Sequence, residues 1–225
     1  MELNADFSKR VVVHSDKLEW MKSPMPGVDR RMLDRIGGEV ARATTIVRYA
    51  ARSSFLEHTH TGGEELIVLD GVFSDEHGDF PKGSYIRNPP TSAHTPGSEL
   101  GCVIFVKLWQ FDLEDRTQVK IDMNKMEAVP AAGRTGVAVM PLFQDARETV
   151  RTEFWDAGTD IELNLPDGGE FLVLSGGFVE GDDELVEGGW LRVARGCILH
   201  AKAGKNGAWV WMKLRHIPHA RPPAV

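Results

Sequence analysis

Short apolar runs separated by turn residues dominate the hydrophobic pattern of this chain. Examples are residues 66–69 (Leu-Ile-Val-Leu) and 103–106 (Val-Ile-Phe-Val), with similar runs at 171–174 and 209–212. Runs of about four residues bounded by Gly, Pro and Asp are typical of strands rather than helices. Only residues 30–35 and 115–126 leave room for a helical turn. The pattern therefore predicts an all-β fold.

The sequence also repeats itself. A shift of 106 residues brings Gly62-Gly-Glu64 onto Gly168-Gly-Glu170, and His94 onto His200. A shift of 105 instead matches Arg87 with Arg192 and places Leu199 opposite His94, and the sequence leaves both registers open. A repeat of this length predicts two tandem double-stranded β-helix (jelly-roll) barrels. We expect an N-terminal arm over residues 1–22, a first domain over 23–115, and a second, degenerate domain over 116–225.

Two smaller segments add detail to this picture. Val11–Val13, in the arm, is apolar enough to add an edge strand to either sheet. The acidic segments 74–79 and 181–184 lie at matching places in the two copies. Their spacing fits no calcium-loop signature, so we interpret them as solvated hairpin tips.

Charge and composition narrow the function classes. The 225 residues carry 26 Lys and Arg against 33 Asp and Glu, a net charge of −7. An acidic chain without a basic cluster is a poor nucleic-acid binder. No apolar stretch approaches the roughly 20 residues of a membrane span, and no signal peptide is visible, so we expect a cytoplasmic protein. Two cysteines are too few for a disulfide framework, and we expect Cys102 and Cys197 to be small, buried hydrophobic side chains.

Residues 57–65 (Glu-His-Thr-His-Thr-Gly-Gly-Glu-Glu) carry the candidate chemistry. On a strand, His58 and His60 point to the same face, and the glycine pair permits a turn that returns Glu64 to that side. His94 can supply a third imidazole from the far side of a hairpin. Three neutral nitrogens and one carboxylate predict a site for one divalent transition metal. Glu65 is expected to point the opposite way.

This pattern resembles the two motifs of the cupin superfamily. The first, G-x5-H-x-H-x3,4-E-x6-G, is met at His58, His60, Glu64 and Gly71, with Arg52 in place of the leading Gly. The second, G-x5-P-x-G-x2-H-x3-N, is met at Gly83, Pro89 and His94, with Thr91 for Gly and Ser98 for Asn. The resemblance implies a bicupin with His58, His60, Glu64 and His94 as metal ligands.

The amino-acid sequence resembles the cupin domain of ChrR-type anti-sigma factors more closely still. Segments 61–65, 72–79, 87–90 and 101–107 carry this likeness, which covers about residues 20 to 112 well. The family implies a bound divalent metal, zinc foremost, in a regulatory or sensor role. Its sigma-binding domain carries a His-x3-Cys-x2-Cys motif that this sequence lacks, so anti-sigma activity is not carried over, while sigma-factor-related regulation stays open as a partner relation.

The second copy offers fewer donors under either register. Under the shift of 106 it keeps Glu170 and His200 but has Asn164 and Pro166 where the His pair should be. We therefore expect it to be a structural or ligand-binding partner that holds no metal tightly.

Several other residues have a plain structural interpretation. We expect His14, His77, His216 and His219 to be surface histidines, because none has a spaced partner. Tyr85 and Arg87 share one strand face. They either pack within the protein or line the mouth of the cavity.

The identity of the metal separates two functions. Zinc would have its tetrahedron completed by four donors, which favours sensing. Iron, manganese or nickel would keep open positions, which suits a dioxygenase-like enzyme acting on a small dicarbonyl or phenolic substrate. A small-molecule ligand and a homodimer are the partners we expect, without direct contact to nucleic acid or membrane.

Overall fold

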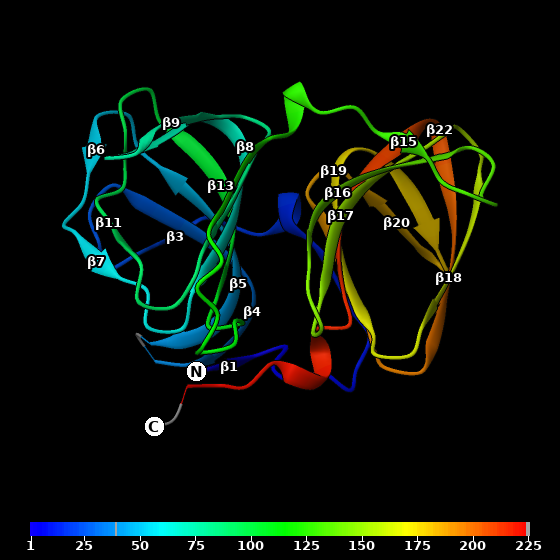
Figure 1. The fold of residues 1–225 in the computed structure, drawn as a ribbon, viewed down its shortest axis with the longest axis horizontal. Coiled ribbons are helices and arrows are strands. Elements are labelled where there is room, and N and C mark those ends of the chain that lie inside the picture. Colours follow the sequence, from blue (N-terminus) through cyan, green and yellow to red (C-terminus); the bar gives the residue numbers. More distant parts are fainter. Residues whose placement is uncertain (39, 224–225) are drawn as a thin grey trace. The chain divides into compact units, whose positions relative to one another are not determined.

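The protein is built from two β-barrels, as the repeat predicts (Figure 1). The computed structural model describes residues 1–38 and 40–223. The first compact unit contains Met1–Ala5, Glu19–Lys125 and the chain from Ala220, and the second contains Asp6–Leu18 and Met126–His219. Within the described residues there is no α-helix, and only short 3-10 segments interrupt the strands: η1 (Ser15–Lys17), η2 (Met123–Lys125) and η3 (Ile217–His219).

The first barrel is an antiparallel sheet with the strand order β1-β4-β5-β13-β8-β10-β14, to which shorter strands add. Its strands are β1 (Glu2–Leu3), β3 (Met21–Lys22), β4 (Val28–Gly37), β5 (Ala41–Tyr49), β6 (Ser53–Ser54), β7 (His58–Thr59), β8 (Glu64–Asp75), β9 (Gly78–Pro81), β10 (Ser84–Asn88), β11 (Ala93–His94), β12 (Gly97–Ser98), β13 (Cys102–Leu108) and β14 (Val119–Asp122). Strands β7 and β11 pair only with each other and form a separate ribbon.

The second barrel repeats this order as β15-β16-β17-β22-β19-β21-β2. Its strands are β2 (Val11–His14), β15 (Val129–Pro130), β16 (Val137–Gln144), β17 (Thr149–Trp155), β18 (Asp160–Leu165), β19 (Gly169–Glu180), β20 (Asp183–Val186), β21 (Gly189–Val193) and β22 (Cys197–Leu214). The predicted arm strand is therefore real, and it pairs with β21 of the second barrel. In the first barrel the equivalent edge, beside β10, is covered by β14.

The predicted apolar runs form the inner walls of the barrels. Residues 66–69 and 103–106 lie in β8 and β13, and 171–174 and 209–212 lie in β19 and β22. Because side chains alternate along a strand, Leu66 and Val68 join the first core while Glu65 faces the other side. The acidic segments turn the β8–β9 and β19–β20 hairpins, as interpreted.

Three expectations from the sequence need correction. Residues 30–35 lie within strand β4 and form no helical turn, because they pair with β5 along their length except at a bulge after Met32. Cys102 is buried, but Cys197 is exposed at the start of β22. His216 is buried, and its Nε2 lies 2.9 Å from Glu170 Oε1.

Strand pairing decides the register of the repeat. His58 lies opposite His94 in the first barrel, and Leu163 lies opposite Leu199 in the second, a shift of 105 at both positions. The final strand follows the shift of 106 instead, since Lys107 and Lys213 occupy equivalent places opposite Glu65 and Glu170. One extra residue between Leu199 and Lys213, within β22, accounts for both registers.

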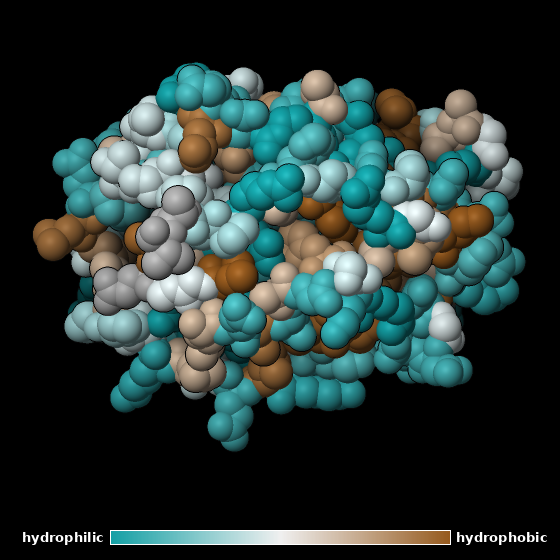
Figure 2. All heavy atoms as spheres, turned by 90° about the horizontal axis from the view of Figure 1, so that it is seen from below, coloured by the Kyte–Doolittle hydropathy of each residue, from teal (hydrophilic) through white to brown (hydrophobic). Residues whose placement is uncertain are grey.

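The outer surface is mainly polar. The face drawn in Figure 2 is covered mostly by hydrophilic side chains, with hydrophobic ones scattered among them. The described part of the chain contains no helix that is long and apolar enough to span a membrane.

Gly71 is a position where the fold requires glycine. Its φ is +69°, and a Cβ there would lie 2.1 Å from the carbonyl oxygen of Gly101. The second barrel repeats this approach, with a Cβ at Gly176 only 2.2 Å from the Gly207 oxygen. Backbone atoms on the neighbouring strand cannot move aside as a flexible side chain would, so neither position tolerates a larger residue.

We therefore predict that Gly71→Ala lowers the free energy of unfolding by ~2–4 kcal/mol, from left-handed strain plus overpacking. Urea unfolding measures this loss. Gly38→Ala is the control, because a Cβ there meets no atom within 4 Å, and it should change stability by less than ~0.5 kcal/mol. Equal losses from the two substitutions would contradict this account of Gly71.

Candidate functional site

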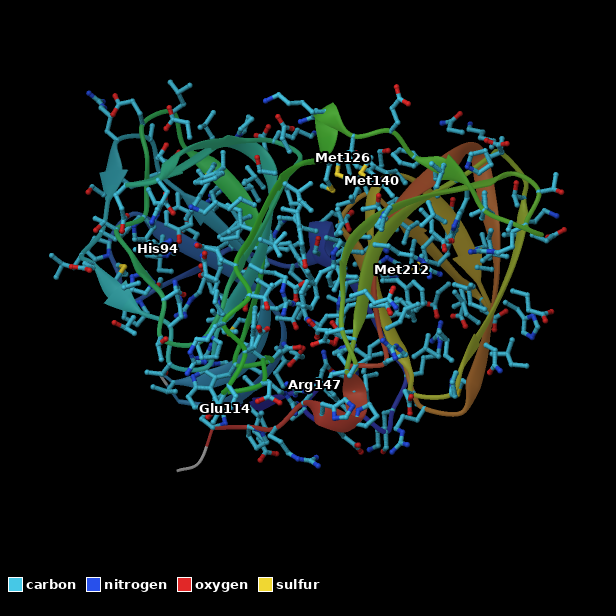
Figure 3. All side chains as sticks on the ribbon, viewed as in Figure 1. His94, Glu114, Met126, Met140, Arg147 and Met212 are labelled. Atoms are coloured by element: carbon cyan, nitrogen blue, oxygen red, sulfur yellow. The ribbon has the colours of Figure 1, made fainter. Side chains whose placement is uncertain are left out.

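The candidate site is built on the small ribbon formed by β7 and β11. Antiparallel pairing places His58 directly opposite His94. The ribbon extends to His60, whose backbone N–H donates to Ser92 O at 2.8 Å. The three imidazole rings lie edge to face with centroids 4.7–5.0 Å apart, and one nitrogen of each lies within 4.8 Å of the others. Figure 3 shows His94 within the first barrel.

Glu64 completes the group from the first position of β8. Its Oε2 lies 3.5 Å from His60 Nε2 and 3.6 Å from His94 Nε2. Asn88, on the neighbouring strand β10, donates its Nδ2–H to the same oxygen at 3.1 Å. The structure thus brings together all four residues that the sequence singled out, and Asn88 orients the carboxylate.

Hydrogen bonds on the far side of two rings fix their orientation. His58 Nδ1 lies 3.3 Å from the carbonyl oxygen of Leu56, and His94 Nδ1 lies 3.3 Å from Asp75 Oδ2. A carbonyl or carboxylate partner favours a proton on Nδ1. The lone pair on Nε2 is then free to bind a metal ion. Asp75 is held in turn by the backbone N–H of His77 at 2.7 Å.

Burial favours the uncharged form of His60 and His94. Burial, with a smaller contribution from the neighbouring His58, lowers the pKa of His60 to about 4. The pKa of His94 is also lowered, chiefly by burial, although the Glu64 carboxylate opposes the shift. Neutral imidazole is the form that binds a metal, so the site is electrostatically prepared for a cation.

The residues present fit a metal ion. His60 Nε2 is buried and has no hydrogen-bond partner among the described residues. Its separation of 3.5 Å from Glu64 Oε2 is too long for a good hydrogen bond. Two donors that each lie about 2.1 Å from one tetrahedral ion would be ~3.4 Å apart. An ion would satisfy a nitrogen that is otherwise costly to bury.

The glycine pair shapes the turn between the His ribbon and Glu64. Gly63 has a φ of +77°, which favours glycine. A Cβ on Gly62 would lie 2.2 Å from the indole ring of Trp109, and a Cβ on Gly63 would lie 2.4 Å from the ring of Phe111. Both glycines are therefore required for the chain to pass these aromatic rings.

A cavity of about 430 Å³ opens beside the site. His58, His60 and Glu64 form part of its wall. Most of the remaining wall is apolar and comes from inward positions of β4, β5 and β13, and Arg30 contributes a guanidinium. The exposed side chains of Met25, Val40 and Leu56 also line it. The arrangement can therefore admit a small molecule to the His cluster.

Several residues near the site escaped sequence reasoning. Asp75 belongs to a segment interpreted only as a hairpin tip, and no spacing rule connects it to His94. Asn88 and Arg30 stand on strands distant in sequence from the His pair, so only the folded sheet brings them close. Cys102 offers no reactive thiol, because burial raises its pKa to about 11.

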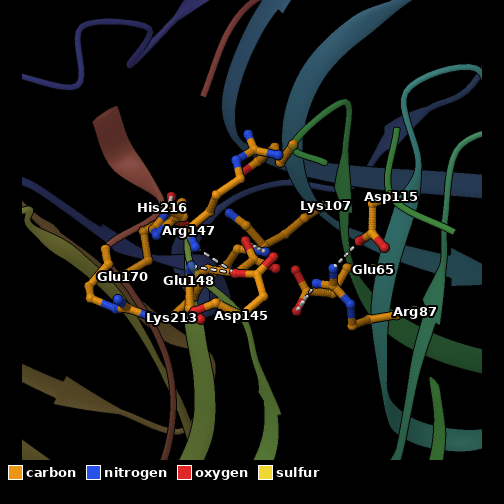
Figure 4. Close-up of polar contacts among 12 residues, drawn as sticks. Glu65, Arg87, Lys107, Asp115, Asp145, Arg147, Glu148, Glu170, Lys213 and His216 are labelled. Atoms are coloured by element: carbon orange, nitrogen blue, oxygen red, sulfur yellow. Dashed lines mark hydrogen bonds and ion pairs between the residues drawn. The ribbon is translucent and has the colours of Figure 1, made fainter. Parts of the chain in front are cut away.

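Tyr85 and Arg87 do not line the cavity. Tyr85 donates its hydroxyl hydrogen to Glu65 Oε1 at 2.6 Å, and Arg87 Nη2 lies 2.9 Å from Asp115 Oδ2. Figure 4 shows the Arg87–Asp115 pair. Glu65 follows Glu64 directly, so its side chain lies on the opposite face of β8.

The second barrel lacks this set of donors. The register places leucines at three of the four equivalent positions and glycine at the fourth: Leu163, Leu165, Gly169 and Leu199. Glu170 corresponds to Glu65 and contacts His216 (Figure 4). Trp190 Nε1–H also donates to Glu170 Oε2 at 3.3 Å. His200 is exposed, with its Nδ1 3.7 Å from Glu162.

Comparison with known proteins agrees with this architecture. Residues 8–112 match the family model described as the ChrR cupin-like domain. No curated protein sequence matches the chain.

Solved structures share the whole fold at low identity. A putative dioxygenase from Nostoc punctiforme is similar with a TM-score of 0.76 and 14% identity, over 97% of this chain and 87% of that one. Protein Ylba from E. coli gives a TM-score of 0.70 and 14% identity, over 98% and 95%. A salicylate 1,2-dioxygenase from Pseudaminobacter salicylatoxidans gives 0.57 and 13%, over 80% and 74%. The sequence match shows a ChrR cupin-like domain over residues 8–112, and the structural matches show that the whole chain shares the fold of these proteins.

Proposed function

We propose that the first barrel binds one divalent transition metal through His58, His60, Glu64 and His94, and that the protein acts as a metal-dependent regulator or sensor of the ChrR type. The observation that carries this proposal is the place of His60 Nε2, a buried nitrogen with no hydrogen-bond partner among the described residues. It belongs to a group of three histidines with ligand nitrogens within 4.8 Å of one another, and it lies 3.5 Å from Glu64 Oε2. Zinc is the expected ion, because four ligands complete its tetrahedron.

The domain match supports the regulatory role. It covers all four proposed ligands within residues 8–112. In a sensor, the ion would hold β7, β11 and β8 in one arrangement, so that loss of the ion or entry of a ligand changes the packing of the barrel. The neutral imidazoles and the two oriented rings lower the free-energy cost of assembling such a site.

A metal-dependent dioxygenase is the second candidate, and the cavity beside His58, His60 and Glu64 favours it. Two structurally similar proteins are named as dioxygenases, one of them acting on salicylate. Iron, manganese or nickel would supply Lewis-acid or redox chemistry at positions left open by the protein ligands. The apolar wall would exclude water from a small dicarbonyl or phenolic substrate.

We predict that His94→Leu abolishes stoichiometric metal binding, whereas His200→Leu leaves it intact. The first substitution installs the residue that the second barrel has at the equivalent place, Leu199, and removes one ligand. The second alters an exposed histidine. Elemental analysis of tag-free protein after dialysis should find one ion per chain in the wild type and in His200→Leu, and almost none in His94→Leu. Equal metal loss from both variants would refute the assignment of the site to the first barrel.

We predict that zinc is retained stoichiometrically and that the Fe(II)-loaded protein consumes no dioxygen with small phenols or dicarbonyl compounds. An oxygen electrode measures the uptake, and the Fe(II)-treated His94→Leu variant is the control for free iron. Uptake that requires both the intact site and a substrate would overturn the sensor role and establish the dioxygenase candidate.

The metal-free protein should lose stability as the pH falls from about 6.5 toward 4. Burial lowers the folded-state pKa of His60 to about 4 from its ordinary value of 6.5, so in this window the unfolded chain binds the extra proton. The full loss from His60 alone is ~3 kcal/mol. Urea unfolding at several pH values should show a shallower slope for His60→Leu, which carries the residue of the second barrel. An unchanged slope would mean that His60 is not the titrating group.

A further inference from the structure

Arg30 is a cation on the inner side of the first barrel. It lies opposite Val47 in the pairing of β4 with β5, and Val28, two residues earlier on the same strand face, belongs to the apolar core. Arg30 lines the same cavity as His58, His60 and Glu64. Its chain neighbours point the other way, since Asp29 pairs with Arg48 on the outer face.

Arg30 has no hydrogen bond or ion pair to any described residue, although it is half buried. Two other arginines of the first barrel are engaged: Arg48 lies 2.7 Å from Asp29, and Arg87 lies 2.9 Å from Asp115. The positive charge around Arg30 is reinforced by Arg35, whose pKa is lowered by burial and then by the charge of Arg30. An unpaired cation in an apolar wall favours an anionic partner.

The other residues of the cavity wall indicate the size and polarity of the rest of the anionic ligand. Val47, Ile104 and Val106 give an apolar surface, and a volume of about 430 Å³ is suited to a small organic molecule. The acidic groups on the wall are Glu57, which is exposed, and Glu64, which accepts a hydrogen bond from Asn88. The wall therefore combines one unengaged guanidinium with a large apolar area.

We propose that this cavity binds a small carboxylate with an apolar body, and that Arg30 anchors the carboxylate. A guanidinium recognises a carboxylate through two parallel hydrogen bonds, and the apolar body packs on the β5 and β13 side chains. The inference deepens the proposed function, since such a ligand would lie beside the proposed metal ligands and be the molecule that is sensed or transformed there.

The test is an NMR titration of the metal-free protein with matched acids and amides. Benzoate is compared with benzamide, and hexanoate with hexanamide, so that each pair differs in charge but barely in shape. The acid should bind about tenfold more tightly than its amide, ~1.4 kcal/mol, and should shift the Arg30 Nε–H signal. Comparing the two acids distinguishes an aromatic from an aliphatic ligand.

Arg30→Gln should reduce the affinity for the acid to that of the amide and leave the amide unaffected. Arg48→Gln is the matched control, because it removes the same charge from the outer face of the same sheet. Equal binding of acid and amide by the wild type, or a preference that survives Arg30→Gln, would overturn the inference. The wild-type comparison decides the matter even if Arg30→Gln does not fold.

The outcomes separate this inference from the metal proposal. A preference for the acid in a protein that takes up no metal would support the carboxylate site and remove the metal centre. Stoichiometric metal binding without any preference for the acid would do the reverse.

Discussion

The burial of polar donors inside an apolar barrel is the constraint on which the site depends. Three imidazoles occupy positions where the second barrel has leucines, and the burial of His60, His94 and Glu64 costs free energy unless a partner offsets it. The second barrel shows the alternative solution, because Leu163, Leu165 and Leu199 stand at the places of the three histidines. The same strand order forms with either set. The donors are therefore not needed for the architecture.

A contrasting set of buried charges is kept in both barrels. Glu65 lies between Arg87 and Lys107 on neighbouring strands of the first barrel, and Glu170 lies between Arg192 and Lys213 in the second. All six are almost fully buried. Each row has further partners within its own barrel: Lys107 donates to Thr44, and Lys213 Nζ lies 2.8 Å from Glu148. A row retained in both copies belongs to the structure that the copies share, whereas the His cluster is specific to one of them.

The strands that both barrels share explain how the first barrel can hold a cluster of buried polar side chains. Hydrogen bonds from outside the cluster hold its members in place, as Asp75 does for His94 and Asn88 for Glu64. These supporting residues lie on β8 and β10, strands that are paired along their length in the main sheet. These paired strands thus position the His cluster and Glu64, and the cavity lies beside them.

The strand-rich fold, the duplication and the four residues of the cluster can be predicted from the order of amino acids alone, because each depends on local spacing and on residue type. That order also indicates that the second copy lacks a full donor set. It could not fix the register, since a single inserted residue makes the shifts of 105 and 106 equally good to a linear comparison, while in a sheet that one residue moves every side chain to the other face. Glu170 and His200 were matched to Glu64 and His94 for that reason. Only the tertiary structure decided that Glu170 corresponds to Glu65, that Asp75 supports His94, and that Arg30 reaches the cavity, because these relations are made by pairing and packing between strands far apart in the chain.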